Sequence, residues 1–173
     1  MVIAGSFYFN VDITTKIVRF INGLSRCRQF SLNEGFLNKH RRSLQSISWH
    51  ECVEDGYISL EELSRMRFSM EDSLQMKSTK RDLPTGMPNP KCHWIIDRND
   101  RLLWDGDESF DDCKEWLQYL IDRFFQPEGV TISGQVICYE SDIQNGSFII
   151  ADNNVLTTVP FRLFKDGEHW ILQ

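Results

Sequence analysis

The sequence predicts an α+β fold, in which two main helices cover one face of a mostly antiparallel sheet. Segments with strand-like alternation and segments with helical periodicity follow one another as strand, helix, two strands, helix and further strands. Turn signals rich in Asn, Asp and Gly separate consecutive strands, which favours antiparallel hairpins. Apolar residues make up 41% of the 173 residues and charged residues 25%. A chain of this length and composition buries a core without disulfides.

The N-terminal elements are a strand and an amphipathic helix. In residues 6–12, two phenylalanines alternate with Ser, Tyr and Asn, which is typical of a half-buried strand. Behind a capping threonine, Ile17, Ile21 and Leu24 recur at helical spacing and predict a helix with one apolar face.

Residues 31–91 predict a helical and irregular insertion. The sequences at 59–62 and 69–72 fit capping boxes, in which a Ser and an acidic residue three positions later open a helix. Residues 83–91 contain three Pro and one Gly, so this stretch reads as a connector.

The best-defined region covers residues 92–159 and has the order ββαββ. Two apolar segments around the polar residues 98–100 predict a hairpin. Ser109 and Asp112 fit a capping box for the next helix, which Pro127 and Gly129 end. Its apolar face consists of Phe110, Cys113, Trp116, Leu117, Leu120, Ile121, Phe124 and Phe125.

The remaining strands are predicted from their turns. Asn145-Gly146 and Asp152 to Asn154 are the turn signals that bound two strands, and Asp166-Gly167 predicts a C-terminal hairpin. With the insertion set aside, the order is β-α-β-β-α-β, the ferredoxin-like arrangement, extended by the C-terminal hairpin. We expect residues 1–173 to form a single domain.

Composition narrows the class of function. No apolar run is long enough to span a membrane, and the N-terminus lacks the basic and apolar regions of a signal peptide, so we expect a cytoplasmic protein. The five Cys are widely spaced without a C-x-x-C pair, which argues against a disulfide framework and a zinc site. We predict no metal and no cofactor.

Charge is divided unevenly along the chain. Residues 1–50 hold seven Lys/Arg and two Asp/Glu, a charge of +5, so the net charge of −6 leaves −11 for residues 51–173. An acidic chain disfavours nucleic acid as a partner. A cluster of arginines in the basic part is nevertheless a candidate phosphate-binding site for a nucleotide. Its members are Arg26, Arg28, Arg41 and Arg42.

The sequence LLWDGDESFDDCKEW, residues 102–116, is the densest acidic stretch. It fails as a calcium loop, because the positions that must be Gly and Glu hold other residues. It also lacks the partners of a hydrolytic site, and no nucleophile-elbow, zincin or P-loop motif occurs in the chain. The remaining interpretations are a charged helix start and an acidic surface for a partner protein. The candidate contact residues are Asp105, Asp107, Glu108, Asp111 and Asp112.

Residues 84–156 resemble a family of small uncharacterised proteins of phages, prophages and bacterial mobile elements. The matching residues are Cys92, Trp94, Trp104, Asp105, Gly106, Glu108, Phe110, Glu115 to Leu117, Tyr119 to Ile121, Pro127, Gly129, Gly134, Asp152, Asn153 and Val155. The chain departs from the family pattern at the turn 140–146. The resemblance implies an α+β domain of phage or mobile-element origin, and therefore the host cytosol as its location, but it implies no activity.

Three functions follow as hypotheses. The first is a non-enzymatic inhibitor of phage type, which binds a host or defence-system protein through the acidic surface. The second is a protein that binds or hydrolyses a small nucleotide with the arginine cluster. The third is a toxin-immunity protein, which differs from the first mainly in the identity of its partner. The oligomeric state does not follow from the sequence.

Overall fold

The structure is a computed structural model, and its chain divides into two compact units. The sheet unit consists of Met1–Thr14 and His93–Gln173, and the inserted unit consists of Thr15–Cys92. The described residues are 2–26, 29–31, 34–45, 57–59, 87–89, 91–107, 110, 112–139, 144–166 and 169–172. The predicted single domain of residues 1–173 stays a prediction.

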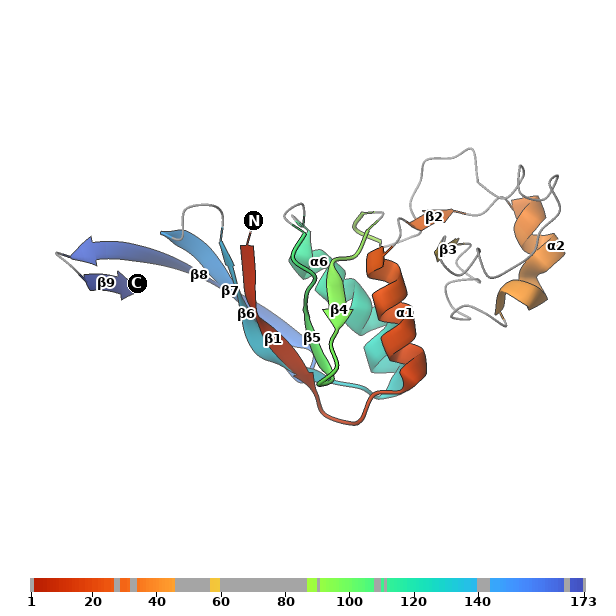
Figure 1. Cartoon of the computed structure of the whole chain (residues 1–173), viewed down its shortest axis with the longest axis horizontal. Coiled ribbons are helices and arrows are strands. Elements are labelled where there is room, and N and C mark those ends of the chain that lie inside the picture. The colour runs from red at the N-terminus through yellow and green to blue at the C-terminus, as the bar shows by residue number, and fades with distance from the viewer. Residues whose placement is uncertain are drawn as a thin grey trace. The chain divides into compact units, whose positions relative to one another are not determined.

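The sheet unit contains a seven-stranded antiparallel sheet (Figure 1). Its order is β4-β5-β1-β6-β7-β8-β9, so the first strand of the chain lies in the interior of the sheet. The strands are β1 (Val2–Phe9), β4 (Trp94–Ile96), β5 (Arg101–Trp104), β6 (Ile132–Tyr139), β7 (Asn145–Asp152), β8 (Val155–Asp166) and β9 (His169–Leu172). The predicted α+β class with an antiparallel sheet is confirmed, as are the hairpins β4–β5 and β8–β9. The ferredoxin-like arrangement stays a prediction, because it also requires both crossover helices on one face.

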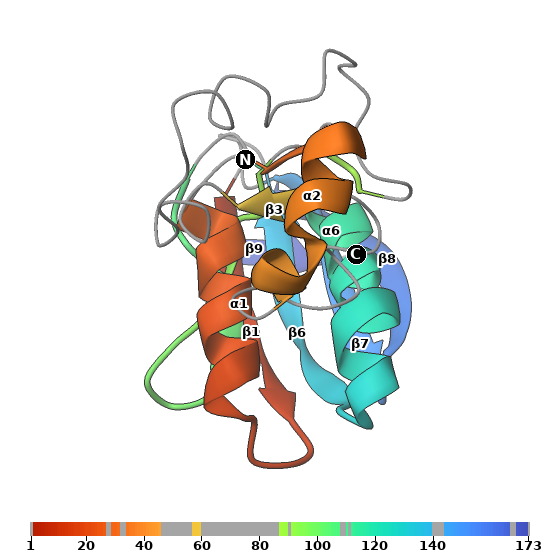
Figure 2. The same ribbon diagram turned by 90° about the vertical axis from the view of Figure 1, so that its right-hand side faces the viewer.

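One face of the sheet forms the core together with helix α6 (Cys113–Leu120). A π-helical turn (Ile121–Phe125) and a 3-10 turn (Gln126–Glu128) prolong α6. Figure 2 shows this helix running alongside the strands. The largest fully buried side chains of this unit are aromatic, which suits a core between a helix and a sheet. They are Phe7, Trp94, Phe110, Trp116, Phe124 and Phe125.

The ends of α6 were predicted unequally well. Gly129 ends the helical segment as expected, with φ +70° and its N–H bonded to the Gln126 carbonyl at 3.1 Å. The start was wrong, because α6 begins at Cys113 with Asp112 as its N-cap residue, without a side-chain capping bond. Phe110 precedes the helix and packs edge-to-face on Trp94, with ring centroids 5.6 Å apart.

Two adjacent asparagines form the turn between β7 and β8. Asn153 and Asn154 have φ of +48° and +71°, so this hairpin has the left-handed two-residue turn that its sequence predicted. The Asn154 side chain accepts from the Ile132 N–H at 2.8 Å and donates to the Val130 carbonyl at 3.0 Å. The turn is thereby fixed to the start of β6.

The turn predicted at Asn145-Gly146 was wrong, because both residues belong to β7. Strand β8 continues through Pro160. Pro160 is tolerated there because β9 pairs with β8 only from Leu163 onward. One side of β8 therefore has no ladder hydrogen bond for proline to remove at this position.

Glycines let β1 and β6 approach closely at two positions. Gly5 and Gly134 have φ of +112° and +137°. A Cβ added at Gly5 would lie 2.5 Å from the Gln135 carbonyl oxygen, and one at Gly134 would lie 2.7 Å from that of Ser6. Only glycine combines this backbone conformation with this spacing.

Within its described residues, the inserted unit shows two helices and a short two-stranded ladder. Its elements are α1 (Thr15–Arg26), β2 (Gln29–Ser31), α2 (Glu34–Gln45) and β3 (Tyr57–Ser59), with β2 and β3 antiparallel. Ile17, Ile21 and Leu24 of α1 are buried, which confirms the predicted apolar face. The helices predicted to start at Ser59 and Ser69 lie outside the described residues. In the described part of the chain, no helix is long and apolar enough to cross a membrane.

Candidate functional site

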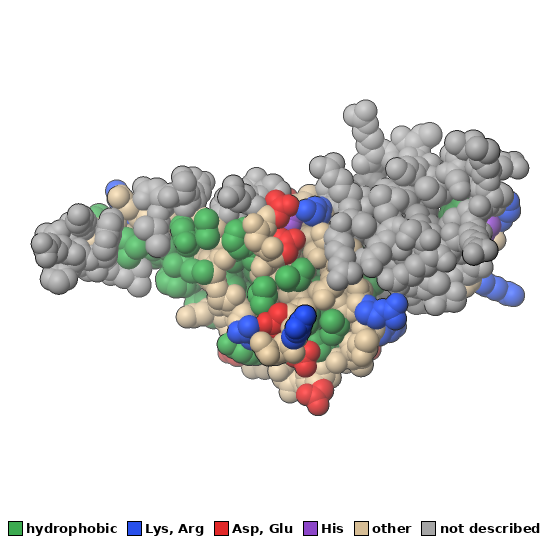
Figure 3. All heavy atoms as spheres, in the orientation of Figure 1, with side chains coloured by type: hydrophobic (Ala, Val, Ile, Leu, Met, Phe, Trp, Pro, Cys, Tyr) green, Lys and Arg blue, Asp and Glu red, His purple; other side chains and the backbone are tan. Residues whose placement is uncertain are grey.

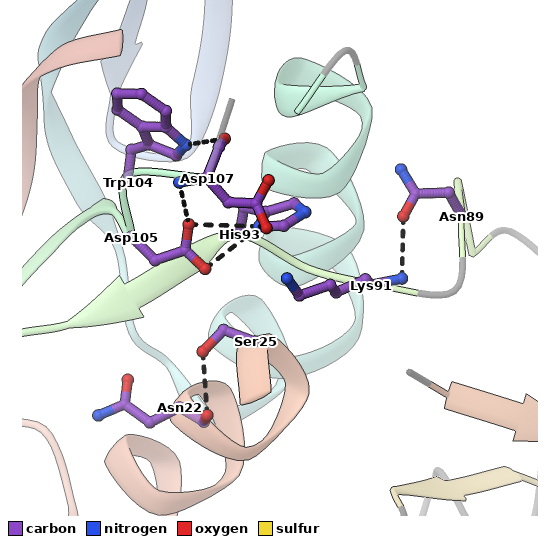
Figure 4. A network of polar contacts seen from close by, with 8 residues as sticks. All are labelled: Asn22, Ser25, Asn89, Lys91, His93, Trp104, Asp105 and Asp107. Atoms are coloured by element: carbon purple, nitrogen blue, oxygen red, sulfur yellow. Dashed lines mark hydrogen bonds and ion pairs between the residues drawn. The ribbon is translucent and has the colours of Figure 1, made fainter. Parts of the chain in front are cut away.

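The acidic stretch begins where the β4–β5 hairpin ends, and its first carboxylate turns inward (Figure 4). Asp105 lies opposite His93, and its N–H donates to the His93 carbonyl at 2.9 Å. Both oxygens of the Asp105 carboxylate lie 3.2 Å from His93 Nδ1. One of them also accepts the Asp107 N–H at 2.9 Å, which closes a tight turn over Gly106.

His93 is the centre of this cluster. Its side chain is only 3% exposed, and its ring packs edge-to-face on Phe110 at 4.9 Å between centroids. A carboxylate oxygen of Asp107 lies 3.8 Å from Nδ1, on a side chain that is 38% exposed. Trp104 fixes the turn from the other side, because its indole N–H donates to the Asp107 carbonyl at 2.9 Å.

The contacts of this cluster hold the local backbone in place. A carboxylate at Nδ1 can orient an imidazole for proton transfer, but such a pair needs a reacting group at the other ring nitrogen. In Figure 4 the second nitrogen of His93 points away from both carboxylates. Among the described residues, no three His, Cys, Asp or Glu side chains converge as metal ligands. The pair fixes the loop after β5 to the residue that precedes β4.

The structure separates the members of the predicted acidic surface. Asp105 is engaged with His93 and 18% exposed, whereas Asp107 stays partly exposed beside it. Asp112 is half-buried at the start of α6, and Glu108 and Asp111 lie outside the described residues. The acidic surface as a partner site therefore stays a prediction.

The sequence interpretation missed His93 as the partner of Asp105. The signal was the register of the hairpin. Trp94 pairs with Trp104, so the residues one step further out, His93 and Asp105, must face each other. If the hairpin turn had been assigned to residues 97–101 in the sequence, this register would have followed.

That turn is held by a second acidic residue. The Asp97 carboxylate accepts from the N–H groups of Asn99 at 2.9 Å and Arg101 at 3.0 Å, and from the Arg101 guanidinium at 2.6 Å. Burial alone would raise the pKa of Asp97, but the hydrogen bonds from Arg101 and the backbone outweigh it and hold the pKa below its ordinary value. The negative charge of Asp97 is thus paired with Arg101 within the hairpin.

The predicted phosphate site cannot be assembled from the described side chains. Arg42 is exposed on α2. Arg26 and Arg41 lie in α1 and α2 with side chains outside the described set, and Arg28 lies outside it altogether. Nucleotide binding by these arginines stays a prediction.

The sheet presents a second apolar surface on the side that faces away from the core. The cross-strand row Ala4, Ile137, Phe148 and Val159 lies on this side. Its members on β1, β6 and β7 stand next to buried residues that face the core, and Val159 joins the row as the partner of Phe148. Three further rows lie on the same side of β1, β6, β7 and β8. They are Val2, Tyr139, Gly146 and Phe161; Ser6, Gln135, Ile150 and Thr157; and Tyr8, Ser133, Asp152 and Val155. We call these four rows the open face.

The open face is largely apolar and almost uncharged, and its side chains range from buried at Phe161 to well exposed. Tyr8 is 56%, Val155 68% and Val159 42% exposed. Within the four rows the one charged residue is Asp152. Hydrophobic side chains gather on the surface over β7 and β8 (Figure 3). The chain as a whole has a net charge of −6, whereas this face contains a single charged residue.

An aromatic pair stiffens this face. The Phe161 ring lies over Gly146, where an added Cβ would stand 2.6 Å from its Cζ atom. The same ring stacks at a tilt on Phe148, with centroids 5.1 Å apart. A glycine covered by a cross-strand aromatic ring is a recognised way to stabilise a sheet. It also explains why Gly146 belongs to a strand and not to a turn.

A hollow adjoins the open face where two strands separate. β1 pairs with β5 only at Phe7 with Leu102 and Tyr8 with Arg101, and the strands diverge beyond these pairs (Figure 1). The resulting depression has a volume of about 360 Å³. It is lined by Ile3, Gly5, Ser6, Arg101, Leu103 and Trp104.

Comparison of the chain with protein families, with curated proteins and with solved structures finds no match. The function must therefore be argued from the molecule itself.

Proposed function

We propose that this protein binds another protein, and that the open face is the contact surface. The observation that carries the proposal is a face of four paired strands whose apolar side chains are exposed on β1 and β8 and half-buried on β6 and β7. Four strands about 4.8 Å apart, each contributing about seven residues at roughly 3.3 Å, give a face of about 440 Å², most of whose residues are apolar. Exposed apolar patches of this size on a single chain are often functional.

The chemistry of the face selects the kind of partner. Large apolar and aromatic side chains such as Tyr8, Phe148 and Val159 suit the dry centre of a protein interface. A nucleic acid would need a basic surface, and an anionic membrane would be repelled by the acidic chain. The partner we propose is a protein with an apolar patch of its own.

The acidic residues have a separate place in this proposal. Asp107 and Asp112, with Glu108 and Asp111, would steer a partner whose patch has a basic border and so raise the association rate. Asp105 contributes less to this steering, because its carboxylate is engaged with His93. The resemblance to phage and mobile-element proteins supports a host or defence-system protein as the partner, with inhibition as the result.

We also propose the ferredoxin-like arrangement for β4, β5, β1 and β6, whose order and directions fit it.

The test uses two neighbouring positions on one strand. Val159 lies on the open face, while Thr158 is exposed on the opposite face of β8. Tagged wild type, V159K and T158K proteins are used to capture partners from host cells, and bound proteins are quantified by mass spectrometry. We expect a partner that T158K retains and that V159K loses by about tenfold or more, since about 1.4 kcal/mol suffices.

Binding of the purified partner is then measured by calorimetry. Equal circular dichroism spectra and thermal midpoints of the two variants establish that the fold is intact. If every captured protein binds V159K as well as T158K, the open face is not the contact surface. The identity of the captured protein decides between a defence protein and a toxin.

A further inference from the structure

Two buried cysteines meet where helix α6 crosses strand β6. Cys113 is the first residue of α6 and Cys138 is the penultimate residue of β6. Their Sγ atoms are 3.9 Å apart, so one thiol donates a weak hydrogen bond to the other. Each residue is 5% exposed, whereas Cys92 is fully buried at 0%. The pair is therefore shielded, but it retains some contact with solvent.

The two sulfur atoms differ chemically. The hydrogen bond with Cys138 lowers the pKa of Cys113, although burial and the nearby Glu115 oppose this. The same contact, together with burial, raises the pKa of Cys138. Cys113 is thus the sulfur of the pair that loses its proton more readily, and the Cys138 thiol can then donate to it. A nucleophilic thiolate beside a second thiol is the arrangement in which a sulfenic acid can be resolved to a disulfide.

We propose that Cys113 and Cys138 are a site of reversible oxidation, at which a small peroxide converts the two thiols into an intramolecular disulfide. The Cys113 thiolate attacks one oxygen of hydrogen peroxide, the O–O bond breaks, and hydroxide leaves a sulfenic acid on Cys113. The Cys138 sulfur then attacks the Cys113 sulfur. The S–O bond breaks, and the departing hydroxide takes the Cys138 proton and leaves as water. Two thiols and one peroxide thus give one disulfide and two waters.

The local structure permits the small movement that this reaction needs. A disulfide bond is about 2.05 Å long, so the sulfur atoms must approach by about 1.9 Å. Cys113 is the first residue of its helix, where the backbone can adjust more readily than in a helix interior. The Cys113 carbonyl accepts the Trp94 indole N–H at 2.9 Å, so this movement reaches a tryptophan at the centre of the core. Oxidation would fasten α6 covalently to the sheet.

The experiment treats reduced, full-length wild-type protein with hydrogen peroxide and removes the excess with catalase. Free thiols are alkylated under denaturing conditions before peptide mapping. We expect a linked peptide pair containing Cys113 and Cys138, lighter by about 2 Da than the reduced pair, and its loss on treatment with dithiothreitol. Cys92 should be recovered in its alkylated form, as the internal control. The thermal midpoint of the oxidised protein should shift upward.

Variants test the order of the two steps. With C138S, which lacks the resolving thiol, we expect a dimedone-reactive sulfenic acid on Cys113 and no disulfide. With C113S, we expect Cys138 to stay unmodified, because it lacks the thiolate partner. Recovery of both cysteines as free thiols in the folded wild type, together with disulfide formation only after unfolding, would overturn the proposal. So would sulfinic acid on Cys113 without the linked peptide. The wild-type measurement decides the matter even if a variant fails to fold.

Discussion

Asn154 offers the most direct test of how the sheet is held together, because one side chain makes two bonds from a left-handed backbone position. Replacement by Ala removes the bond to the Ile132 N–H and the bond to the Val130 carbonyl. At about 0.5–1.5 kcal/mol each, these bonds account for about 1–3 kcal/mol. Alanine at φ +71° adds about 1 kcal/mol of strain. We expect N154A to lower the free energy of unfolding by about 2–4 kcal/mol.

Two further variants separate these contributions. N154D keeps the acceptor oxygen and tolerates the left-handed region, so it loses only the donor and should cost about 0.5–1.5 kcal/mol. N153A shares the positive φ, but it loses only an exposed bond to Asp152, so it should cost about 1 kcal/mol. Urea denaturation followed by circular dichroism gives all three values with one common slope. If N154A is no more destabilising than N153A, the bonds to β6 do not hold the turn.

Three other substitutions test single features. G134A places a Cβ 2.7 Å from a backbone oxygen of β1 at φ +137°. We expect urea denaturation to show that the free energy of unfolding falls by about 2–4 kcal/mol. A decrease below about 1 kcal/mol would mean that the strands can move apart. D97N removes a carboxylate whose pKa is lower in the folded state than its ordinary value of 3.8. The ionised carboxylate therefore stabilises the folded state above pH 3.8, and this stabilisation is lost as the pH falls through the lower pKa of the folded state. The difference in unfolding free energy between wild type and D97N should therefore be present at pH 6 and shrink below about pH 4, and a difference independent of pH would contradict this account. D105N keeps the acceptor for the Asp107 N–H but loses the contact between the carboxylate and His93. Chemical denaturation should show that the free energy of unfolding falls by about 1–2 kcal/mol. An unchanged free energy of unfolding would mean that the contact does not stabilise the fold.

The periodic elements could be predicted from the sequence because they depend on local pattern. The alternation in β1 and the helical spacing of Ile17, Ile21 and Leu24 survive in the structure. The start of α6 could not be placed, because Ser109 with Asp112 fits a capping box as well as any true helix start. What decided the matter was tertiary packing, since Phe110 fills the space beside Trp94 before the helix begins.

The features that bear on function depend on contacts between distant residues. The pairing of His93 with Asp105 follows from hairpin register, and it withdraws one carboxylate from the surface to which the sequence assigned it. The open face requires the order of β1, β6, β7 and β8, because apolar residues on both sides of a strand look alike until one side is covered. Cys113 was placed on the apolar face of its helix, but its proximity to Cys138 could not be predicted, because it arises only where α6 crosses β6.

The interior position of β1 has a consequence for how the chain folds. Its partners β5 and β6 are reached only at residues 101 and 132, so β1 must wait through most of synthesis before its neighbours leave the ribosome. Closing such distant pairs is slow, and an unpaired apolar strand is prone to aggregate in the meantime. A chain that lacks residues 2–9 would keep the β4–β5 hairpin and the β6–β9 meander but have nothing to join them. Tags at the N-terminus should therefore be separated from Val2 by a flexible linker.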